Sequence, residues 1–361
     1  MATSLDPIQQ RKQKDGETPV QFESRKADHI RLSLDRKNQA EGLSGLQQVR
    51  LTHEALPDLN FDQVSLGVKS LGRKIATPFM VSSMTAGHSD SVNLNLRLAK
   101  ACAERNWRMG VGSQRRELSD SNAAEEWKVI RKAAPKVSLL GNLGIAQLIQ
   151  SSVMDVQRLV DALEAEAMIV HLNALQECLQ PEGTPRFRGG LKAIEKICHR
   201  LKVPVVVKET GCGFSKATLK RLRGVGVAAV DVSGLGGTHW GRIEGGRSAE
   251  RDMRARAAET LGNWGIPTVE SLLNAQSAKV DYEIWASGGV RSGLDAAKLL
   301  AMGADVVGVA MPILDSALKG EEELRNTMAT FEFELKTALF CTGSATIADL
   351  QDKKAWSWQA T

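Results

Sequence analysis

Short apolar runs alternate with longer amphipathic stretches along most of the chain. Each short run is followed by polar or glycine-rich residues, and a segment with helical periodicity comes next. Apolar runs this short, bounded by turn residues, are typical of buried strands rather than of helices. The pattern predicts eight strands, at residues 76–84, 109–112, 137–140, 168–170, 203–207, 228–232, 282–285 and 306–309.

Apolar residues between these strands recur at helical spacing. Leu94, Leu98 and Ala101 form one such set, which would bury one face of a helix. The same periodicity predicts helices at residues 90–105, about 116–132, 153–166, 191–201, 215–223, 269–278, 294–301 and 321–339.

Regular alternation of strand and helix predicts parallel strands with right-handed crossovers. We therefore expect an α/β protein with a (β/α)8 TIM barrel. A doubly wound open sheet is the competing architecture, but neither the dinucleotide fingerprint nor the P-loop pattern follows the first strand. We expect a single domain over residues 25–361, with a disordered arm at 1–24 and a long polar insert from residue 239 to about 265, after the sixth strand.

Composition narrows the class of protein only moderately. Apolar residues make up 42% and charged residues 25%, and the net charge is +5, without a dense basic run. These values suit a globular protein with a small anionic substrate and give no indication of nucleic-acid binding. The five cysteines have irregular spacing, no secretory signal precedes residue 24, and no apolar run reaches membrane-spanning length. We expect a cytoplasmic protein with no membrane partner.

Polar groups follow nearly every predicted strand. In a (β/α)8 barrel these carboxyl ends meet at one face, which is where active sites of this fold lie. A set of polar residues there predicts a lined pocket. They are Ser83, Met84 and Thr85; Ser113, Gln114 and Arg115; Asn142; His171 and Asn173; Lys208; Ser233 and Thr238; Gly289 and Arg291; and Ala310 and Met311.

A glycine-rich turn at residues 286–293 lies between the seventh strand and its helix. Glycines allow the backbone to approach a ligand closely, and N–H groups at a helix start attract anions. Arg291 adds a forked donor that suits phosphate. This turn and the eighth strand form the usual phosphate site of such barrels, so we predict a phosphate-bearing cofactor here.

Lys208 follows the apolar run Val205-Val206-Val207, where an unpaired ammonium is costly. It could contact a cofactor, form a Schiff base, or pair with a core carboxylate such as Glu209. The residue types leave these three alternatives open.

Two further segments carry candidate chemistry. Glu177 lies in a stretch rich in hydrogen-bonding groups and could be a Mg²⁺ ligand or part of a surface helical turn. His171 could be a base, a phosphate donor or a structural residue. Arg25 and Lys26, with His29 nearby, could clamp a phosphate or form a solvated basic pair.

Taken together, these motifs resemble the type 2, flavin-dependent isopentenyl-diphosphate isomerases. The resemblance covers almost the whole chain in order, from about Arg25 to Leu339. The matching segments are 25–29, Ser83-Met84-Thr85, Gly112-Ser113-Gln114-Arg115, Gly141-Asn142-Leu143-Gly144, 171–183, Val207-Lys208-Glu209, Asp231-Val232-Ser233-Gly234, Gly236-Gly237-Thr238 and 286–293. The seventh-strand motif alone is shared with many flavin barrels.

The resemblance implies a TIM barrel that carries FMN and interconverts isopentenyl and dimethylallyl diphosphate in isoprenoid biosynthesis. It also implies Mg²⁺ on Glu177, NADPH as the reductant of the flavin, and a homo-oligomer, a tetramer or octamer. The FMN contacts it implies are Ser83, Met84, Thr85, Ser113, Asn142, Lys208, Ser233, Thr238, Gly289, Val290, Arg291, Ala310 and Met311. The substrate contacts are Arg25, Lys26, His171, Asn173 and Gln176, to which we add Ser113 and Arg115.

The reaction itself limits which groups could catalyse it. An isolated alkene must gain a proton at one carbon and lose one at another, and water must be excluded from the cationic intermediate. Glu177 and Glu209 are the only carboxylates among the predicted strand ends, and Glu177 is assigned to metal. We therefore expect reduced flavin to be the acid/base group, with Gln176 orienting the alkene or relaying the proton and with His171 and Asn173 as further catalytic candidates.

Two positions depart from the family pattern. Ala86 stands where the family usually has glycine, and His239 stands where a small hydroxyl residue is usual.

Two other functions remain open. The first alternative function is an FMN-dependent 2-hydroxy-acid oxidase, although no histidine lies near the seventh strand. The second is a non-catalytic flavin-binding barrel.

Overall fold

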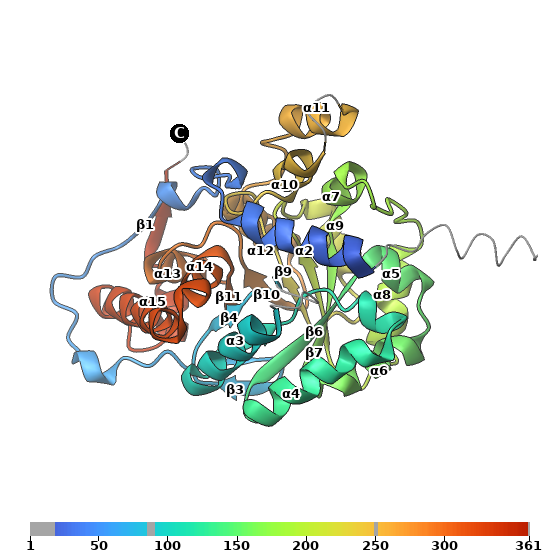
Figure 1. Ribbon diagram of the computed structural model, residues 1–361. Coiled ribbons are helices and arrows are strands. Elements are labelled where there is room, and N and C mark those ends of the chain that lie inside the picture. The colour runs from blue at the N-terminus through green and yellow to red at the C-terminus, as the bar shows by residue number, and fades with distance from the viewer. Residues whose placement is uncertain (1–18, 85–90, 249–251, 360–361) are drawn as a thin grey trace, which may run out of the picture.

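The computed structural model describes residues 19–84, 91–248 and 252–359, and it is built around a closed barrel of eight parallel strands (Figure 1). Each strand pairs with the next one along the chain, and the last pairs with the first, with Gly308 opposite Met80. This order confirms the predicted (β/α)8 barrel. The strands are β4 (Phe79–Val81), β5 (Arg108–Gly110), β6 (Ser138–Gly144), β7 (Ala167–Leu172), β8 (Val205–Glu209), β9 (Ala229–Asp231), β10 (Glu283–Ala286) and β11 (Val306–Val309).

Helices surround the barrel and connect its strands. Capping side chains fix several of their starts: Ser152 and Ser292 each accept a backbone N–H three residues on. The helices are α3 (Ser91–Arg105), α4 (Glu125–Ala133), α5 (Ile145–Gln150), α6 (Val153–Leu163), α7 (Ala174–Leu179), α8 (Gly190–Cys198), α9 (Lys216–Leu222), α10 (Trp240–Arg247), α11 (Met253–Thr260), α12 (Thr268–Ala278), α13 (Gly293–Ala301), α14 (Met311–Lys319), α15 (Glu321–Cys341) and α16 (Ile347–Lys353).

Smaller elements complete the chain. They are the 3-10 helices η1 (Arg36–Asn38), η2 (Leu46–Gln48), η3 (Phe61–Gln63), η4 (Arg116–Leu118) and η5 (Ser121–Ala124), the antiparallel pair β1 (Val49–Leu51) and β12 (Trp356–Trp358), and the hairpin β2 (Val68–Ser70) and β3 (Arg73–Ile75).

The barrel interior is filled by side chains. One buried apolar cluster, which includes Met80, Ile169 and Trp285, occupies the inside of the barrel, and Ile75 of the β2–β3 hairpin packs against it. Arg108 lies 5.6 Å from the Trp285 ring centroid. A larger cluster fills the space between the strands and the helices. With the interior packed, ligands can be held only at the strand ends.

The eight predicted strands are confirmed, with shifted ends. β6 continues through Gly144, so Asn142 lies within a strand rather than in a turn, and β8 includes Lys208 and Glu209. The predicted helix at 116–132 begins only at Glu125, after two 3-10 turns. Helix α14 was not predicted, because its first residues read as the end of the eighth strand.

Two elements cover the carboxyl ends of the strands. Helix α2 (Pro19–Ser33) and the insert helix α10 lie on the same side of the barrel, and α11 projects beyond α10 (Figure 1). Residues 19–24 were predicted to be disordered, but they form the start of α2; residues 1–18 lie outside the described part of the chain. The insert after the sixth strand is present and helical. No helix in the described ranges has both the length and the apolarity needed to cross a membrane.

Candidate active site

Two adjoining pockets open at the carboxyl ends of the strands. The glycine-rich pocket has about 970 Å³ of empty space, including the open space at its mouth, and is lined by residues that include Gly237, Gly289 and Val290. The amide-rich pocket has about 790 Å³, again including its mouth, and is lined by residues that include Asn173 and Gln176. The two pockets share the lining residues His29, Ser83, Met84, Lys208, Thr210 and Trp240. They therefore form one continuous site that has room for two ligands in contact.

The structure brings the predicted site residues together at these pockets. Ten predicted cofactor residues line the glycine-rich pocket: Ser83, Met84, Lys208, Ser233, Thr238, Gly289, Val290, Arg291, Ala310 and Met311. The amide-rich pocket holds Arg25, Ser113, Arg115, Asn142, His171, Asn173, Gln176 and Glu177. Thr85 and Ala86 lie outside the described residues, and Lys26 lies on α2 with its side chain not described.

The backbone itself forms the wall of the glycine-rich pocket. Gly288 and Gly289 have φ values of 100° and 79°, which side chains other than hydrogen disfavour. A Cβ on Gly289 would lie 2.6 Å from the Gly236 carbonyl oxygen, and one on Gly237 would lie 2.7 Å from the Gly289 nitrogen. Only glycine fits at these positions without moving the backbone that faces the pocket.

The predicted anion site at the start of α13 needs a correction. The Arg291 N–H donates to Asp295, and the Gly293 N–H donates to Glu334, so protein carboxylates occupy these donors at the helix start. The N–H groups of Gly289 and Val290 have no backbone partner in the part of the chain that the structure describes. The donors available to an anion therefore lie in the loop before the helix.

The Arg291 side chain reaches back to the N-terminal segment. Its Nη2 donates to Gln39 Oε1 at 2.6 Å, and Gln39 Nε2 in turn lies 3.2 Å from Thr238 Oγ1 and 2.6 Å from the Ser33 carbonyl oxygen. Burial lowers the pKa of Arg291, although Glu41 and Asp295 oppose this shift. Gln39 thus connects the end of α2 to the edge of the glycine-rich pocket.

Lys208 forms an ion pair, but not with Glu209. Its Nζ lies 3.2 Å from Asp231 Oδ2 and 2.8 Å from Ser233 Oγ. Sequence reasoning missed Asp231 because the residue lies on the neighbouring strand, directly opposite Lys208. An ion-paired ammonium is a poor nucleophile, so the structure argues against the Schiff-base alternative.

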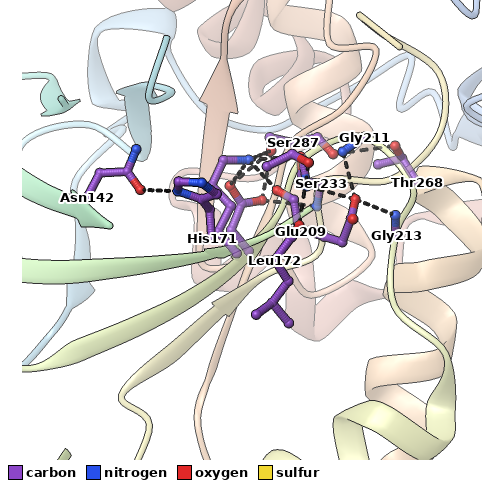
Figure 2. Close-up of polar contacts among 12 residues, drawn as sticks. Asn142, His171, Leu172, Glu209, Gly211, Gly213, Ser233, Thr268 and Ser287 are labelled. Atoms are coloured by element: carbon purple, nitrogen blue, oxygen red, sulfur yellow. Dashed lines mark hydrogen bonds and ion pairs between the residues drawn. The ribbon is translucent and has the colours of Figure 1, made fainter. Parts of the chain in front are cut away.

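The Glu209 carboxylate organises the loop after β8. Its Oε2 accepts the N–H groups of four successive residues, from Thr210 to Gly213, and Figure 2 shows the bonds to Gly211 and Gly213. Burial raises the pKa of Glu209 to about 7, although these N–H groups and Lys208 favour the charged form. Thr210 is thereby fixed at the border between the two pockets.

One ring nitrogen of His171 is oriented by an amide. Asn142 Nδ2 donates to the Val111 carbonyl oxygen at 3.1 Å, so Asn142 Oδ1 is the acceptor for His171 Nδ1 at 2.9 Å (Figure 2). This contact places the proton of the neutral ring on Nδ1 and leaves Nε2 as an acceptor.

Gln176 lies at the centre of the amide-rich pocket and is held by a carboxylate from the insert. Gln176 Nε2 donates to Glu244 Oε1 at 2.9 Å, and Asn173 Nδ2 lies 3.3 Å from Gln176 Oε1. His29 Nε2 lies 2.9 Å from the same Glu244 oxygen, and Arg247 Nη1 lies 2.6 Å from the other.

Glu244 is fully buried and is the main site residue that sequence reasoning missed. Burial alone raises its pKa, but hydrogen bonds from His29 and Gln176 and the charges of His29 and Arg247 outweigh that effect and hold the pKa at about 2. No local pattern distinguishes this residue. It reaches the site only because the insert folds over the strand ends.

Glu177 lies beside Gln176 and is nearly buried. Its Oε1 accepts from Asn173 Nδ2 at 3.0 Å, and its Oε2 accepts the Thr184 N–H. Among the described residues, no group of three or more histidine, cysteine, aspartate or glutamate side chains is placed to hold a metal ion. A Mg²⁺ ion on Glu177 would therefore need its other ligands from a bound substrate and from water.

The departure at position 239 affects the insert rather than the pocket lining. His239 Nδ1 accepts the Arg242 N–H at 3.2 Å and so caps α10, and Nε2 lies 3.1 Å from the Trp264 carbonyl oxygen. The next residue, Trp240, lines both pockets and makes an edge contact with His29. His239 thus fixes the helix that carries Trp240 and Glu244.

Three buried polar atoms at the pockets have no partner within the described residues. They are Ser82 Oγ, Ser83 Oγ and Asn173 Oδ1. Leaving a buried polar group unpaired costs about 1–3 kcal/mol. These atoms, together with the glycine-lined backbone, fit a polar ring system on one side and a second polar ligand on the other.

The sequence is similar to those of curated relatives over nearly its whole length. It is 56% identical over 342 residues to an isopentenyl-diphosphate delta-isomerase of Bdellovibrio bacteriovorus, covering 94% of this chain and 99% of the relative. It is 55% identical to one from Legionella pneumophila, with 92% and 97% covered, and 41% identical to one from a Nostoc species, with 92% and 95% covered. The family model for FMN-dependent dehydrogenase matches residues 172–357.

Solved structures share the fold at low sequence identity. A flavocytochrome b2 variant with benzoylformate has a TM-score of 0.68 at 19% identity, covering 94% of this chain and 84% of that one. A mandelate oxidase variant with (S)-mandelic acid has a TM-score of 0.63 at 16% identity, covering 93% and 95%. At this identity the likeness supports the barrel architecture alone.

Proposed function

The chain belongs to the family of FMN-dependent isopentenyl-diphosphate delta-isomerases, and we propose that the two pockets divide this activity between them. The glycine-rich pocket would hold FMN, and the amide-rich pocket would hold the diphosphate substrate. The observation that carries this proposal is that the two pockets are continuous and share Ser83, Met84 and Lys208. A substrate in one pocket would lie against a cofactor in the other.

The residues present fit FMN. The loop N–H groups of Gly289 and Val290 and the Arg291 side chain would hold the phosphate, next to Ala310 and Met311. Toward the shared border, Ser83 and Lys208 supply an unpaired hydroxyl and a cation for the ring. The remaining members of the proposed set are Met84, Thr85, Ser113, Asn142, Ser233 and Thr238. Ser113 and Asn142 line only the amide-rich pocket, so they would contact the part of the cofactor that faces the substrate.

The reaction needs proton transfer at two carbons of the substrate. When bound and reduced, the flavin supplies the acid/base chemistry. Gln176 would orient the alkene or relay the proton, because it lines the amide-rich pocket and its amide is held by Glu244 at Nε2 and by Asn173 at Oε1. Trp240 and α2 cover the strand ends and would exclude water from the cationic intermediate.

Cationic and polar groups at the opposite end of the amide-rich pocket would bind the diphosphate. Arg25, which is buried on α2, lines this pocket, and so do His171 and Arg115. Glu177 would share a Mg²⁺ ion with diphosphate oxygens. Lys26 and Ser113 complete the proposed substrate set.

Three further features belong to the same proposal. NADPH would reduce the flavin, since the isomerisation itself has no net redox change. The protein would act in the cytoplasm, where its five cysteines, all free in the structure, would stay reduced. We also propose a homo-oligomer, a tetramer or octamer, with no membrane or nucleic-acid partner.

The test is to convert isopentenyl diphosphate under defined conditions. The purified protein with FMN and Mg²⁺ is reduced anaerobically, in one sample by NADPH and in another by dithionite, and dimethylallyl diphosphate is followed by NMR in D₂O. We expect product and deuterium incorporation in both samples. Product with dithionite alone would disprove NADPH as reductant, and no product in either would disprove the proposed function.

The same preparation tests the oxidase alternative. A 2-hydroxy acid added anaerobically to the oxidised protein would bleach the flavin absorption if the protein were a 2-hydroxy-acid oxidase. We expect no bleaching, because Trp285 and Ala286 precede the glycine-rich turn and the histidines that line the pockets are His29 and His171, on other walls. Bound FMN without either reaction would indicate a non-catalytic flavin protein.

A further inference from the structure

A buried carboxylate lies beneath the floor of the glycine-rich pocket without reaching it. Lys208 lines both pockets, and its Nζ lies 3.2 Å from Asp231 Oδ2. Asp231 itself is 2% exposed and is not among the residues that line either pocket. Asp231 therefore does not contact a molecule bound in either pocket, and it would act on such a molecule through its charge and through Lys208 and the serines around it.

Both charged groups are held firmly. Ser287 Oγ donates to the Asp231 carboxylate, at 2.8 Å from Oδ1 and 2.9 Å from Oδ2, and the Ser233 N–H donates to Oδ1 at 3.2 Å. The Lys208 ammonium donates to the Ser233 hydroxyl at 2.8 Å and to the Glu209 carbonyl oxygen at 2.9 Å. Figure 2 shows Ser233, Ser287 and Glu209 converging at this point.

This network supplies the Lys208 ammonium with both a charged partner and neutral hydrogen-bond acceptors. With Asp231, Ser233 and the Glu209 carbonyl each within hydrogen-bond distance, the three ammonium hydrogens are all satisfied within the protein. The ammonium is therefore fixed in place, and its positive charge is largely offset by a carboxylate on the far side from the pocket. A ligand in the glycine-rich pocket meets a positioned donor that carries little net charge.

We infer that Asp231 is a positioning residue that sets the charge which Lys208 presents to the bound flavin, an inference that rests on the proposed FMN site. Reduction adds negative charge to the flavin ring, so an unbalanced cation beside it favours the reduced, anionic form. Isomerisation without net redox change requires the reduced ring both to give and to take a proton. The paired carboxylate prevents Lys208 from over-stabilising the anion and so keeps that proton exchangeable.

The experiment compares flavin affinity in two redox states across matched variants of the holoenzyme. Dissociation constants for oxidised and for reduced FMN are measured in the wild type, Asp231→Asn and Lys208→Met, together with the pKa of the reduced flavin from its absorption spectrum. Asp305→Asn is the control, because Asp305 is a half-buried aspartate next to a barrel strand that lies outside both pockets and accepts the Ile284 N–H.

We expect the two charge variants to shift in opposite directions. Asp231→Asn should strengthen reduced FMN binding relative to oxidised binding by about tenfold, which for a two-electron couple corresponds to about +30 mV, and it should lower the pKa of the reduced flavin. Lys208→Met should weaken reduced FMN binding relative to oxidised binding and raise that pKa. Asp305→Asn should leave both quantities unchanged.

An unchanged affinity ratio in Asp231→Asn, or a shift in the same direction as in Lys208→Met, would overturn the inference. If Asp231→Asn does not fold, the double variant Lys208→Met with Asp231→Asn provides the test, since it leaves no unpaired buried charge. It should bind reduced FMN more tightly, relative to oxidised FMN, than Lys208→Met alone, and an equal ratio in these two variants would also overturn the inference. A wild-type protein that binds no FMN would instead disprove the proposed function.

Discussion

The two pockets are built from different parts of the chain. The glycine-rich pocket is shaped mainly by backbone, at Gly237, Gly288 and Gly289, where a side chain has no room. The amide-rich pocket is lined by functional side chains such as Gln176, which the buried Glu244 holds from behind the lining. One pocket depends on the absence of side chains, and the other depends on their chemistry.

This difference separates the binding of the cofactor, which many enzymes on this barrel share, from the binding of the substrate, which is particular to each of them. A backbone cradle for a phosphate-bearing cofactor suits any enzyme on this barrel that uses the cofactor, and the FMN-dependent dehydrogenase model matches the segment that includes it. On the proposed division of the site, the side chains of the amide-rich pocket would determine which substrate meets the cofactor. We therefore expect changes in the first pocket to affect cofactor binding, and changes in the second to affect turnover or substrate binding.

The largest effect should come from adding a methyl group to the backbone cradle. Gly289→Ala places a Cβ 2.6 Å from the Gly236 carbonyl oxygen. Overpacking costs about 1–3 kcal/mol and the left-handed backbone about 1 kcal/mol more, so FMN affinity should fall about 30- to 700-fold. Fluorescence titration with FMN measures it.

Gly42→Ala is the matched control for that variant. Gly42 has a similar φ of 81° but no atom within 4 Å of the added Cβ, so it tests the backbone strain without the clash. Equal loss of FMN affinity in both variants would show that the cradle does not depend on close approach.

The next effect should appear in turnover alone. Gln176→Asn withdraws the amide from Glu244 by one methylene, so kcat should fall about 100-fold, as for other losses of a positioned proton-transfer group, while FMN stays bound. Steady-state kinetics and the flavin spectrum measure the two quantities. Gln150→Asn, at the exposed end of α5, is the control. Unchanged turnover would remove Gln176 from the mechanism.

A third effect should appear in substrate binding. Arg25→Ala combined with Lys26→Ala removes two cations from α2, and KM should rise about tenfold or more because charge-assisted hydrogen bonds contribute about 1.5–3 kcal/mol each. Arg31→Ala, on the same helix but exposed and paired with Asp28, is the control. A KM equal to that of the wild type would show that α2 does not contact the diphosphate.

A smaller effect should appear in the metal requirement. Glu177→Gln keeps the size of the side chain and removes its charge, so the Mg²⁺ concentration for half-maximal activity should rise about tenfold. A Mg²⁺ titration of activity at saturating substrate measures this. Identical titration curves for the variant and the wild type would exclude Glu177 as the ligand.

The smallest effect should be a change in the pH dependence of stability. Burial lowers the pKa of His239, so the folded protein favours the neutral ring that caps α10. His239 therefore contributes stability that is complete above the unfolded pKa of 6.5 and is lost as the pH falls through the lower folded pKa.

His239→Asn tests this with a cap that does not titrate. The variant should be about 1 kcal/mol less stable at neutral pH, because it loses the contact with Trp264, and the difference should narrow in acid. Denaturant unfolding across this pH range measures it. A constant difference would show that the histidine does not titrate during unfolding.

Most of the fold could be predicted from the sequence, and so could most of the residues that line the two pockets. Strand and helix periodicity are local properties, and the glycine-rich turn has its own residue signature, so the sequence predicts both the barrel and the cradle. Helix α14 and the extensions of β6 and β8 were missed, because hydrogen bonds to neighbouring strands decide where a strand ends.

The tertiary structure alone determined the partners of the predicted residues. Asp231 pairs with Lys208 from the adjacent strand, and Glu244 reaches Gln176 from an insert 68 residues away in the chain. Asp231 lies within the predicted sixth strand and Glu244 within the polar insert, and neither position in the sequence indicates which residue it pairs with. Whether a buried charge has a partner depends on distances across the folded barrel. Those distances are set by the packing of segments that lie far apart in the sequence.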